Sequence, residues 1–402
     1  MEIEIDVERQ REARTYARLR RRFSFIGLGC GAVSVLLVIG LGWDRWLRDL
    51  LRGAFSQGSF LNWQPHTGWY PLQLVLYFLI VFLVYELLTS PLSYYAGFVL
   101  PHRFGLSTLT LGGWLKDLFK GLALNIILEA LAISLIYTLL AYQPQTWWLW
   151  VALVMLFFSV VMANLAPVLL YPLFYKFTPL PEGELTQRLL ALVTRAKTRV
   201  RGVYTMHLSS KTTAANAALM GLGNTRRIVL GDTMLDRYST DEIEVVLAHE
   251  LGHHVHQDIW KLIVSQSVIT LAGLFVANLI LHEVVDSLHF YQSLTDPATL
   301  PFFFLLVGVF SLLVMPLGNA YSRRIEYQAD EYALQSTKNI SAFKSAMIRL
   351  ANQNLSDIEP SPLIEALFYS HPSIKKRLLH ADEFAARHAS AWDASSSISA
   401  AN

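Results

Sequence analysis

The chain is 402 residues long, and 53% of its residues are hydrophobic while only 16% are charged. Soluble domains usually have about a quarter of their residues charged, so this composition excludes an ordinary soluble protein. The formal net charge of +2 at pH 7 gives no reason to expect a nucleic-acid partner. We therefore expect an integral membrane protein surrounded by the lipid bilayer.

Six apolar segments are long enough to cross a bilayer, whose hydrocarbon core of about 30 Å needs about 20 helical residues. Charged residues, Trp, Tyr or Pro border each segment, as anchoring at the membrane interface requires. Buried helices of one large soluble core are the alternative, but six such segments leave too little polar surface for solubility. The predicted spans are 24–43, 71–92, 121–142, 147–171, 261–281 and 300–320.

The first span follows the run Arg20-Arg21-Arg22 and so resembles a signal peptide. Its leading region is long, however, and no small-residue cleavage pattern follows Trp43. We therefore interpret this span as a retained anchor. Cys30, the only cysteine, lies within it and cannot form an intramolecular disulfide.

The distribution of Lys and Arg predicts that both termini are cytoplasmic. Seven arginines precede the first span, whereas 143–146 and 282–299 contain neither Lys nor Arg and are expected to be external. Segment 44–70 disagrees, because it would be external yet contains three arginines. We interpret its start as an amphipathic helix at the interface, which weakens its contribution to orientation. Segment 172–260 then becomes a cytoplasmic insertion.

This insertion contains the sequence His249-Glu250-Leu251-Gly252-His253. Two histidines four positions apart lie on one face of a helix, so both imidazoles can bind one metal ion. The glutamate after the first histidine then lies beside a water on that metal and can act as a general base. The pattern is typical of zinc peptidases. His254 and His256 face other sides of the helix, and we expect them to take no part.

A catalytic zinc site has three protein ligands and one position open to water. Glu326 is the candidate third ligand, because it lies in a polar helix directly after the sixth span. Asp330, one turn later on the same face, is expected to hydrogen-bond a ligand imidazole and fix its tautomer. Alternatively, both carboxylates pair with Arg323 and Arg324 on a solvated helix face, which the histidine pair makes the weaker interpretation.

The insertion also contains a predicted amphipathic helix and a small sheet. The helix is 185–199 and the strands are 203–208, 213–220 and 227–230. Zinc peptidases commonly hold a substrate as an added strand at a sheet edge. Ala215, Asn216 and Ala217 are the candidate edge, because the small alanine side chains let a peptide approach closely. The Asn216 amide is expected to bond the substrate backbone or the tetrahedral intermediate, although its spacing fits an ordinary turn asparagine equally well.

Together with further segments, these residues resemble the type I CAAX prenyl proteases, integral-membrane zinc metalloproteases that trim prenylated proteins. The resemblance extends from about Pro91 to Arg377. The matching segments are Phe104–Thr108, Pro172–Gly183, Asn216–Ala217, Arg227–Leu230 with Asp232–Thr233, His249–His253, Glu326 with Ala329–Asp330, and His371–Pro372 followed by Arg377. In this order, the set is very specific.

The resemblance implies that one zinc ion is bound and that Glu250 is the base. By the same resemblance, Asn216, His371 and Arg377 line the substrate site, where one of them would stabilise the oxyanion. From the residues alone, His371 is merely a histidine at the start of a helix. The zinc ligands implied by the resemblance are His249, His253 and Glu326.

For the architecture, the resemblance implies a ring of tilted helices around a large water-filled chamber. Glu86 and Glu129 lie inside the second and third predicted spans and agree with it, because a charge at that depth needs water or a partner. The chain differs from the eukaryotic members in having six spans where they have seven. It also lacks a retrieval signal of the K-D-E-L kind at its end. We therefore expect a prokaryotic plasma-membrane protein, which leaves the prenylated substrate open.

The predicted fold is an α-helical polytopic membrane protein with six transmembrane helices around an internal chamber and a small α+β metallopeptidase domain. The predicted function is metal-assisted peptide hydrolysis near the C-terminus of prenylated or membrane-tethered peptides. A broad quality-control protease of membrane proteins is the alternative. A non-catalytic scaffold or channel is disfavoured by the intact Glu250. The predicted parts are 1–171 with four spans, the insertion 172–260, the hairpin 261–320, the C-terminal peptidase part 321–387 and a disordered tail 388–402.

Overall fold

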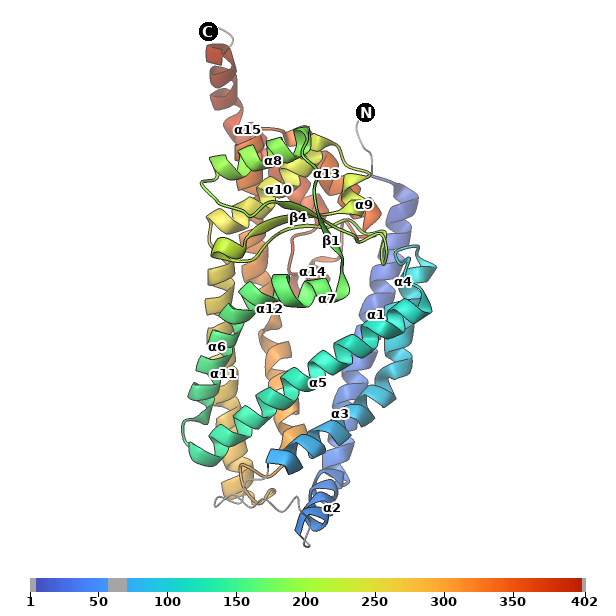
Figure 1. Ribbon diagram of the computed structural model, residues 1–402, viewed down its shortest axis with the longest axis vertical. Helices are drawn as coiled ribbons and strands as arrows, with labels where there is room; N and C mark the ends of the chain where they lie inside the picture. Colours follow the sequence, from blue (N-terminus) through green and yellow to red (C-terminus); the bar gives the residue numbers. More distant parts are fainter. Residues whose placement is uncertain (1–4, 57–70, 400–402) are drawn as a thin grey trace.

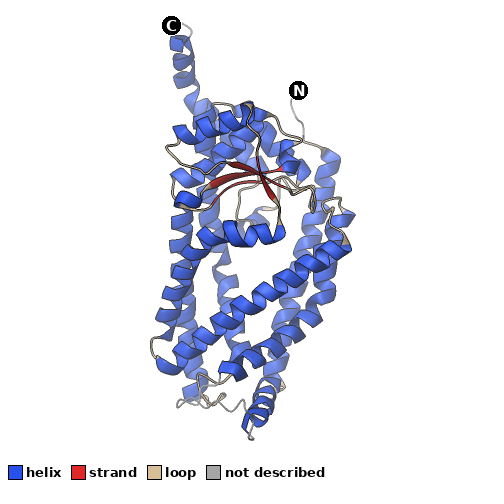
Figure 2. Cartoon of the chain, in the orientation of Figure 1, coloured by secondary structure: helices blue, strands red, loops and turns tan. Residues whose placement is uncertain are grey.

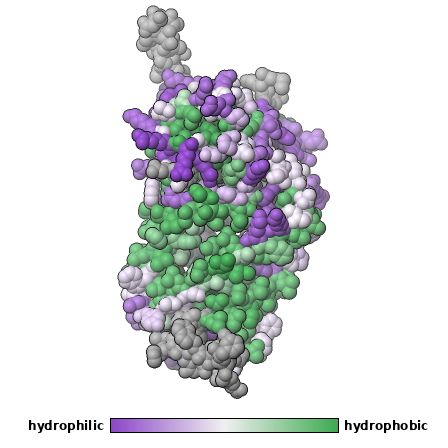
Figure 3. Space-filling view, in the orientation of Figure 1, coloured by the Kyte–Doolittle hydropathy of each residue, from purple (hydrophilic) through white to green (hydrophobic). Residues whose placement is uncertain are grey.

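The computed structural model describes residues 5–56 and 71–399 and is predominantly helical (Figure 1). Long helices make up most of its length, and a small sheet lies among shorter helices at one end (Figure 2). Apolar residues cover the long helices, whereas hydrophilic residues gather over the end that contains the sheet (Figure 3). The chain thus has a membrane part and a polar part stacked along its long axis.

Within the described residues, six helices are long and apolar enough to cross a membrane, which confirms the six predicted spans. The polar helix expected after the sixth span continues that span without a break, because α12 is one helix of 39 residues. The six are α1 (Val7–Gly40), α3 (Pro71–Tyr94), α5 (Leu111–Tyr142), α6 (Trp147–Leu165), α11 (Asp258–His282) and α12 (Thr299–Thr337). The short helices α4 (Leu100–Arg103) and α7 (Tyr171–Phe174) follow α3 and α6, each after one π-helical turn.

The long helices run along the long axis of the molecule or, like α5, obliquely to it (Figure 1), and little of their most apolar parts is buried inside the protein. In the most apolar 18-residue window of each, the buried share ranges from 0% in α1 to 28% in α11. A tightly packed bundle buries most of one face of every helix, so these helices leave large apolar surfaces for lipid. Glu86 of α3 and Glu129 of α5 are both half-buried. The water-filled chamber itself stays a prediction.

The amphipathic helix expected after the first span is α2 (Trp43–Ser56), at the end of the molecule opposite the sheet (Figure 1). Its Arg48 is buried and donates a hydrogen bond to Asp296 at 2.6 Å, in the loop before α12. The Tyr291 hydroxyl donates to Asp44 at 3.1 Å from the same loop. Arg48 is therefore paired with a carboxylate inside the protein, while the predicted orientation of the chain in the membrane stays a prediction. Residues 57–70 lie outside the described part.

The polar end contains a four-stranded sheet in the order β1-β2-β4-β3. β2 and β4 run parallel, and the two edge strands pair antiparallel with them. Three strands were expected. The fourth, β1, was not predicted, because it has only three residues in a proline-containing segment. Of the predicted strand 213–220, only the second half is a strand. The strands are β1 (Phe177–Pro179), β2 (Val203–Met206), β3 (Ala217–Met220) and β4 (Arg227–Gly231).

Helices surround this sheet and share one hydrophobic core with it, in which Leu247, Phe343 and Phe384 are buried. The predicted helix 185–199 ends at Arg195, and the predicted disordered tail 388–402 overlaps the last turns of α15. The helices are α8 (Glu184–Arg195), α9 (Asp232–Leu235), α10 (Thr240–Val255), α13 (Ile340–Gln353), α14 (Pro362–Phe368) and α15 (Ile374–Ser399).

The helix that carries the histidine pair, α10, has well-defined ends. At its start, the Ser239 hydroxyl accepts from the Glu242 N–H and the Glu242 carboxylate accepts from the Ser239 N–H, which is a capping box. At its end, Gln257 has a left-handed backbone with φ of 57°. This left-handed residue separates α10 from α11.

Candidate active site

His249, His253 and Glu326 converge on one point between α10 and α12. One ligand atom from each residue lies within 4.8 Å of the other two. His249 Nε2 is 3.2 Å from His253 Nε2 and 3.4 Å from Glu326 Oε2. His253 Nε2 is 3.5 Å from Glu326 Oε1. The structure therefore gathers the three predicted ligands, although helix α11 and most of α12 separate them in the sequence.

Two further carboxylates contact the imidazoles at Nδ1, on the side opposite the Nε2 atoms that point into the cluster. Asp330 Oδ1 lies 2.9 Å from His249 Nδ1, and Asp258 Oδ2 lies 3.0 Å from His253 Nδ1. A carboxylate at Nδ1 keeps the proton there and leaves Nε2 free to bind a metal. Asp330 was predicted from its helical spacing. Asp258 was not, because it follows the left-handed break at Gln257 and no helical spacing connects it with His253.

The donor atoms fit a zinc ion. In a tetrahedral site with bonds of about 2.0–2.1 Å, neighbouring donors lie about 3.3 Å apart, and the three distances here are 3.2, 3.4 and 3.5 Å. Within the described chain, Glu326 Oε2 is buried without a hydrogen-bond partner. A buried carboxylate oxygen in that state is costly unless a cation binds it. Two imidazoles and one carboxylate leave a fourth position open.

The electrostatics of the cluster also favour a cation. Burial lowers the pKa of His249, but the adjacent carboxylates of Asp330 and Glu326 outweigh burial and raise it to about 9. The surrounding carboxylates thus hold a positive charge at this imidazole even though it is buried. A divalent cation between the ligands would satisfy the same negative potential.

α10 and α12 approach each other closely because a glycine faces an alanine. A Cβ atom on Gly252 would lie 2.9 Å from Ala329 Cα and 3.1 Å from Ala329 O. Both contacts are with backbone, which has no rotamer by which to move away. Ala329 lies between Glu326 and Asp330 on α12, so this close crossing brings both carboxylates within reach of the histidines.

Glu250 is half-buried beside the cluster. Burial raises the pKa of its carboxyl group above the ordinary value, and the positive charges of His249 and His253 oppose part of that increase. A hydrogen bond from the Leu219 N–H of β3 also lowers it. A carboxylate whose pKa is moved toward neutrality is a better general base. The structure thus places a carboxyl group with a raised pKa beside the three gathered ligand groups.

β3 lies at the edge of the sheet, so one of its sides is open. The Asn216 carbonyl accepts the Gly231 N–H at 2.8 Å, and Ala217 pairs with Leu230 in antiparallel register. Backbone groups alternate in direction along a strand, so those of Ala217 and Leu219 point away from β4. Of the three predicted edge residues, Ala217 lies in β3, whereas Ala215 is buried just before it and Asn216 is exposed.

The loop before β3 is held by the end of α13. The Asn354 side chain accepts the Ala215 N–H at 2.8 Å and donates to the Ala215 carbonyl at 3.0 Å. The neighbouring Gln353 donates to the Thr213 carbonyl at 2.8 Å. These amides fix the backbone that leads into the open edge. Nothing in the sequence indicated them, because the contacts join positions more than a hundred residues apart.

His371 and Arg377 both reach the cluster. His371 Nε2, in the loop between α14 and α15, is exposed and lies 3.2 Å from Glu326 Oε1. Arg377 of α15 is buried and donates through Nε to Asp330 Oδ2 at 2.8 Å and through Nη2 to Asp330 Oδ1. Its Nη2 also lies 3.4 Å from His249 Nδ1. Arg377 is thus directed at the carboxylate that orients His249.

The described part of the structure does not contain the alternative ion pairs, in which Glu326 and Asp330 would pair with Arg323 and Arg324. Arg323 donates to backbone carbonyls around the end of α14, including Tyr369 O at 2.6 Å. Asp330 pairs with Arg377 instead. The two carboxylates therefore face the cluster and α15.

Known families cover almost the whole chain. Residues 179–385 match the model of peptidase family M48, and residues 1–176 match the model described as CAAX prenyl protease N-terminal, five membrane helices. The chain belongs to peptidase family M48. In this M48 chain, four of the six long apolar helices, together with the short α2, lie in the region that the second model matches.

Relatives of this M48 chain come from bacteria and eukaryotes. It is 32% identical to the uncharacterized metalloprotease YhfN of Bacillus subtilis, over 78% of this chain and 74% of that one. It is 33% identical to CAAX prenyl protease 1 of Saccharomyces cerevisiae, over 74% and 69% of the two chains. The crystal structure of S. mikatae Ste24p superimposes with a TM-score of 0.80 at 26% identity, covering 94% of this chain and 90% of that one.

Family and fold together establish the general function. The chain is an integral, multi-pass membrane metalloprotease that resembles the CAAX prenyl proteases. As a member of family M48 it acts with a metal ion on peptide or protein substrates. The predicted fold class, with its small α+β part on a helical membrane part, is confirmed.

Proposed function

We propose that this protein is a zinc-dependent endopeptidase in which His249, His253 and Glu326 bind one zinc ion and Glu250 is the general base. The observation that carries the proposal is the convergence of the three donor groups at 3.2–3.5 Å from one another. It is supported by the two carboxylates that orient the imidazoles and by the open strand β3 beside Glu250. No other described group of His, Cys, Asp and Glu residues has this geometry.

When bound, a zinc ion there supplies Lewis acidity toward the scissile carbonyl and makes water a competent nucleophile near neutral pH. The substrate lies extended along the outer side of β3, where the backbone groups of Ala217 bond its main chain. Glu250 accepts the proton of the attacking water and passes it to the leaving amine. The amide of Asn216 is exposed at the start of this edge and bonds the substrate backbone.

His371 and Arg377 have different roles in this proposal. The exposed His371 imidazole lies 3.2 Å from Glu326 Oε1 and, in this proposal, donates a hydrogen bond to the oxyanion. Arg377 is a positioning residue, because its guanidinium is occupied by Asp330 and acts on His249 through that carboxylate. Asp330 in turn fixes the His249 tautomer.

We further propose that the substrates are membrane-tethered peptides, prenylated ones included, cut near their C-terminus on the cytoplasmic side of a prokaryotic plasma membrane. The names of the eukaryotic relatives support the substrate class. The position of the site supports tethering, because Glu326 lies on α12 after its apolar, membrane-spanning part, and Asp258 begins α11, another candidate span. A broad quality-control protease is the second candidate and differs only in substrate range.

The catalytic assignment is tested with purified protein and the variant Glu250→Gln, with Glu182→Gln as an exposed carboxylate control. Removal of the general base lowers the cleavage rate about 10²–10⁴-fold, while zinc content measured by mass spectrometry stays at one ion per chain. Glu182→Gln cleaves at the normal rate. Cleavage by Glu250→Gln at the normal rate would show that another residue is the base.

The substrate class is tested by mass-spectrometric cleavage of a farnesylated C-terminal peptide and its unlipidated twin. Cleavage of the lipidated peptide alone supports the narrow protease. Equal cleavage of both supports the quality-control protease. If neither is cut by the zinc-loaded protein, the catalytic assignment fails and a scaffold becomes the better explanation.

A further inference from the structure

A small pocket opens beside the metal cluster, between the β3–β4 turn and the junction of α10 with α11. Its volume is about 180 Å³. His253 and His254 come from the end of α10, Gln257 and Trp260 from the break and the first turn of α11, and Leu222 and Arg226 from the turn after β3. Because His253 is a wall of this pocket as well as a proposed metal ligand, the pocket adjoins the place where a peptide bond would be cut.

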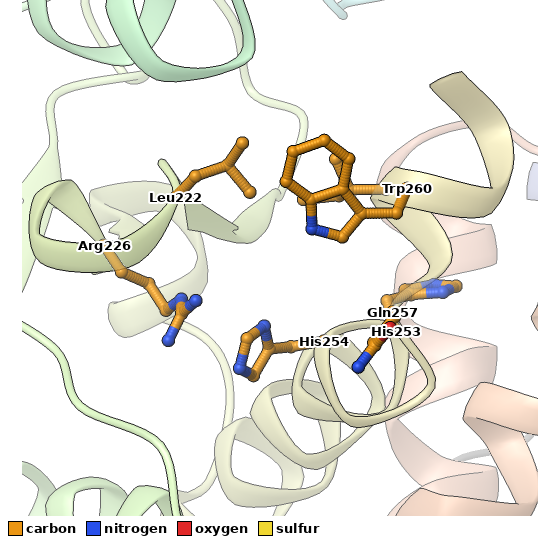
Figure 4. A pocket seen from close by; sticks show the side chains of 7 residues that line it. Leu222, Arg226, His253, His254, Gln257 and Trp260 are labelled. Atoms are coloured by element: carbon orange, nitrogen blue, oxygen red, sulfur yellow. The ribbon is translucent and has the colours of Figure 1, made fainter. Parts of the chain in front are cut away.

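The pocket contains a cation without an anion. Arg226 is half-buried, and within the described chain burial alone lowers the pKa of its guanidinium, with no carboxylate or hydrogen-bond acceptor beside it. The lining residues include no Asp or Glu. In Figure 4 the Arg226 and His254 side chains extend toward each other, with the Trp260 indole forming the wall above them. A guanidinium stays charged even when partly buried, so an anion entering this pocket finds an uncompensated positive charge.

The chemistry of the lining favours a carboxylate. A planar guanidinium binds a carboxylate through two parallel hydrogen bonds. The Gln257 amide and the His254 imidazole add N–H donors, while Leu222 and Trp260 provide apolar contacts for a short aliphatic stem. An acidic amino-acid side chain combines these two features. The nearby Arg227, by contrast, is engaged with the Pro167 carbonyl and is not available.

The position of the pocket indicates which part of a substrate enters it. β3 ends at Met220, and the chain then turns through Gly221 to Leu222 on the pocket wall. A peptide added to the open side of β3 pairs best in the antiparallel direction. Its amino-terminal part therefore lies next to the end of β3 and continues into the pocket. The residues that follow the scissile bond lie at the other end, toward Asn216.

We propose that this pocket is a substrate subsite in which Arg226 binds an acidic side chain upstream of the scissile bond. The proposal rests on the proposed function, because it requires a peptide on β3. It adds a preference in the sequence of the substrate, within the few residues before the cleavage point. A cleaved membrane-tethered peptide is then selected both by its attachment to the bilayer and by a charge.

The test uses the purified full chain and peptides that carry Asp, Asn or Lys at each of the four positions before the scissile bond. At one of these positions we expect kcat/KM to be about tenfold higher for Asp than for Asn. The ratio falls to about one in Arg226→Gln, and Arg226→Glu favours Lys at the same position. The control Arg199→Gln removes an exposed arginine outside the pocket and keeps the full ratio. Thermal unfolding confirms that each variant is folded.

Several outcomes would overturn the proposal. These are the absence of any ratio above about twofold in the unmodified protein, a ratio that persists in Arg226→Gln, and an Arg226-dependent preference located after the scissile bond. A response to phosphatidylserine vesicles that depends on Arg226, without any preference for Asp, would assign the pocket to a lipid phosphate instead.

Failure of the proposed function is distinguishable from failure of the subsite. If no peptide is cleaved, the endopeptidase assignment fails, and fluorescein-labelled Asp and Asn peptides are then titrated onto the zinc-loaded chain. A Kd about tenfold lower for the Asp peptide, lost in Arg226→Gln, supports the subsite. Equal Kd values overturn it.

Discussion

Asp258 Oδ2 lies 3.0 Å from His253 Nδ1, although the two residues belong to different helices separated by the left-handed Gln257. The second oxygen of Asp258 accepts from Lys261 Nζ at 2.9 Å, and the carboxylate is buried. The break between α10 and α11 therefore places a fixed acceptor behind a proposed metal ligand. A continuous helix would have directed residue 258 away from His253.

The first prediction concerns this carboxylate. Asp258→Asn is expected to weaken zinc binding about 10–100-fold, because the imidazole loses the acceptor that fixes its tautomer and orientation. Zinc affinity is measured by competition with a fluorescent chelator. Asp286→Asn is the matched control, since Asp286 pairs with His282 Nδ1 at 2.8 Å at the far end of α11. Equal zinc affinities in the two variants would contradict a role for Asp258 at the metal.

The second prediction concerns the crossing of α10 and α12. Gly252→Ala is expected to destabilise the protein by about 1–3 kcal/mol through overpacking and to weaken zinc binding, because a methyl group at 2.9 Å from Ala329 Cα forces the helices apart. Gly308→Ala is the control on α12, where no atom lies within 4 Å of the added Cβ. The midpoint of thermal unfolding and the zinc content are measured. A Gly252→Ala protein with normal values for both would show that the crossing has room to adjust.

The third prediction separates substrate binding from metal binding. Asn354→Ala frees the Ala215 backbone that leads into β3, so KM is expected to rise several-fold while zinc affinity stays unchanged. Steady-state kinetics of peptide cleavage and chelator competition are the two measurements. Asn352→Ala is the neighbouring control, because the Asn352 Oδ1 has no hydrogen-bond partner among the described residues. An unchanged KM in Asn354→Ala would mean that β3 is held in place without this amide.

The fourth prediction concerns pH. Burial raises the pKa of Glu242, but hydrogen bonds from Ser345 and from the Ser239 N–H outweigh it and hold the pKa below its ordinary value. A carboxylate with a lowered pKa in the folded state stabilises the protein above the unfolded pKa of about 4.3, and this contribution is lost as the pH falls through the folded value. Glu242 also caps α10, so acid is expected to loosen the helix that carries both histidines.

The measurement is the midpoint of thermal unfolding between pH 7 and pH 3. Glu242→Gln is expected to unfold at a lower temperature at pH 7, by a loss of about 1–3 kcal/mol, and to lose less further stability than the unmodified protein below about pH 4.5. Glu359→Gln is the control, because Glu359 makes an exposed pair with Lys375 and such pairs contribute little. If the midpoint of thermal unfolding changed with pH equally in Glu242→Gln and in the unmodified protein, Glu242 would not be the source of the pH dependence.

The parts of this protein that depend on local sequence were predictable from it. Hydropathy measures the free energy of transferring each residue from water into lipid. The six spans therefore follow from the amino-acid sequence alone. Helical spacing places His249 and His253 on one face, and Asp330 one turn from Glu326. The strand carrying Ala217 was likewise expected, from short segments of β-branched or small residues with turn signals between them.

Other features exist only because distant segments meet. Asp258 depends on a left-handed backbone at one residue, and Arg377 reaches Asp330 from the last helix. Asn354 lies just after the end of α13, and Arg226 lies in the turn between β3 and β4. The hydrophobic periodicity of the sequence does not fix where these elements end. Long-range contacts are selected by the packing of the whole chain, which spacing in one segment does not encode. The sequence therefore determined which groups are proposed to perform the chemistry. The tertiary structure decided which groups hold them in place and where the proposed subsite lies, because those contacts join segments far apart in the chain.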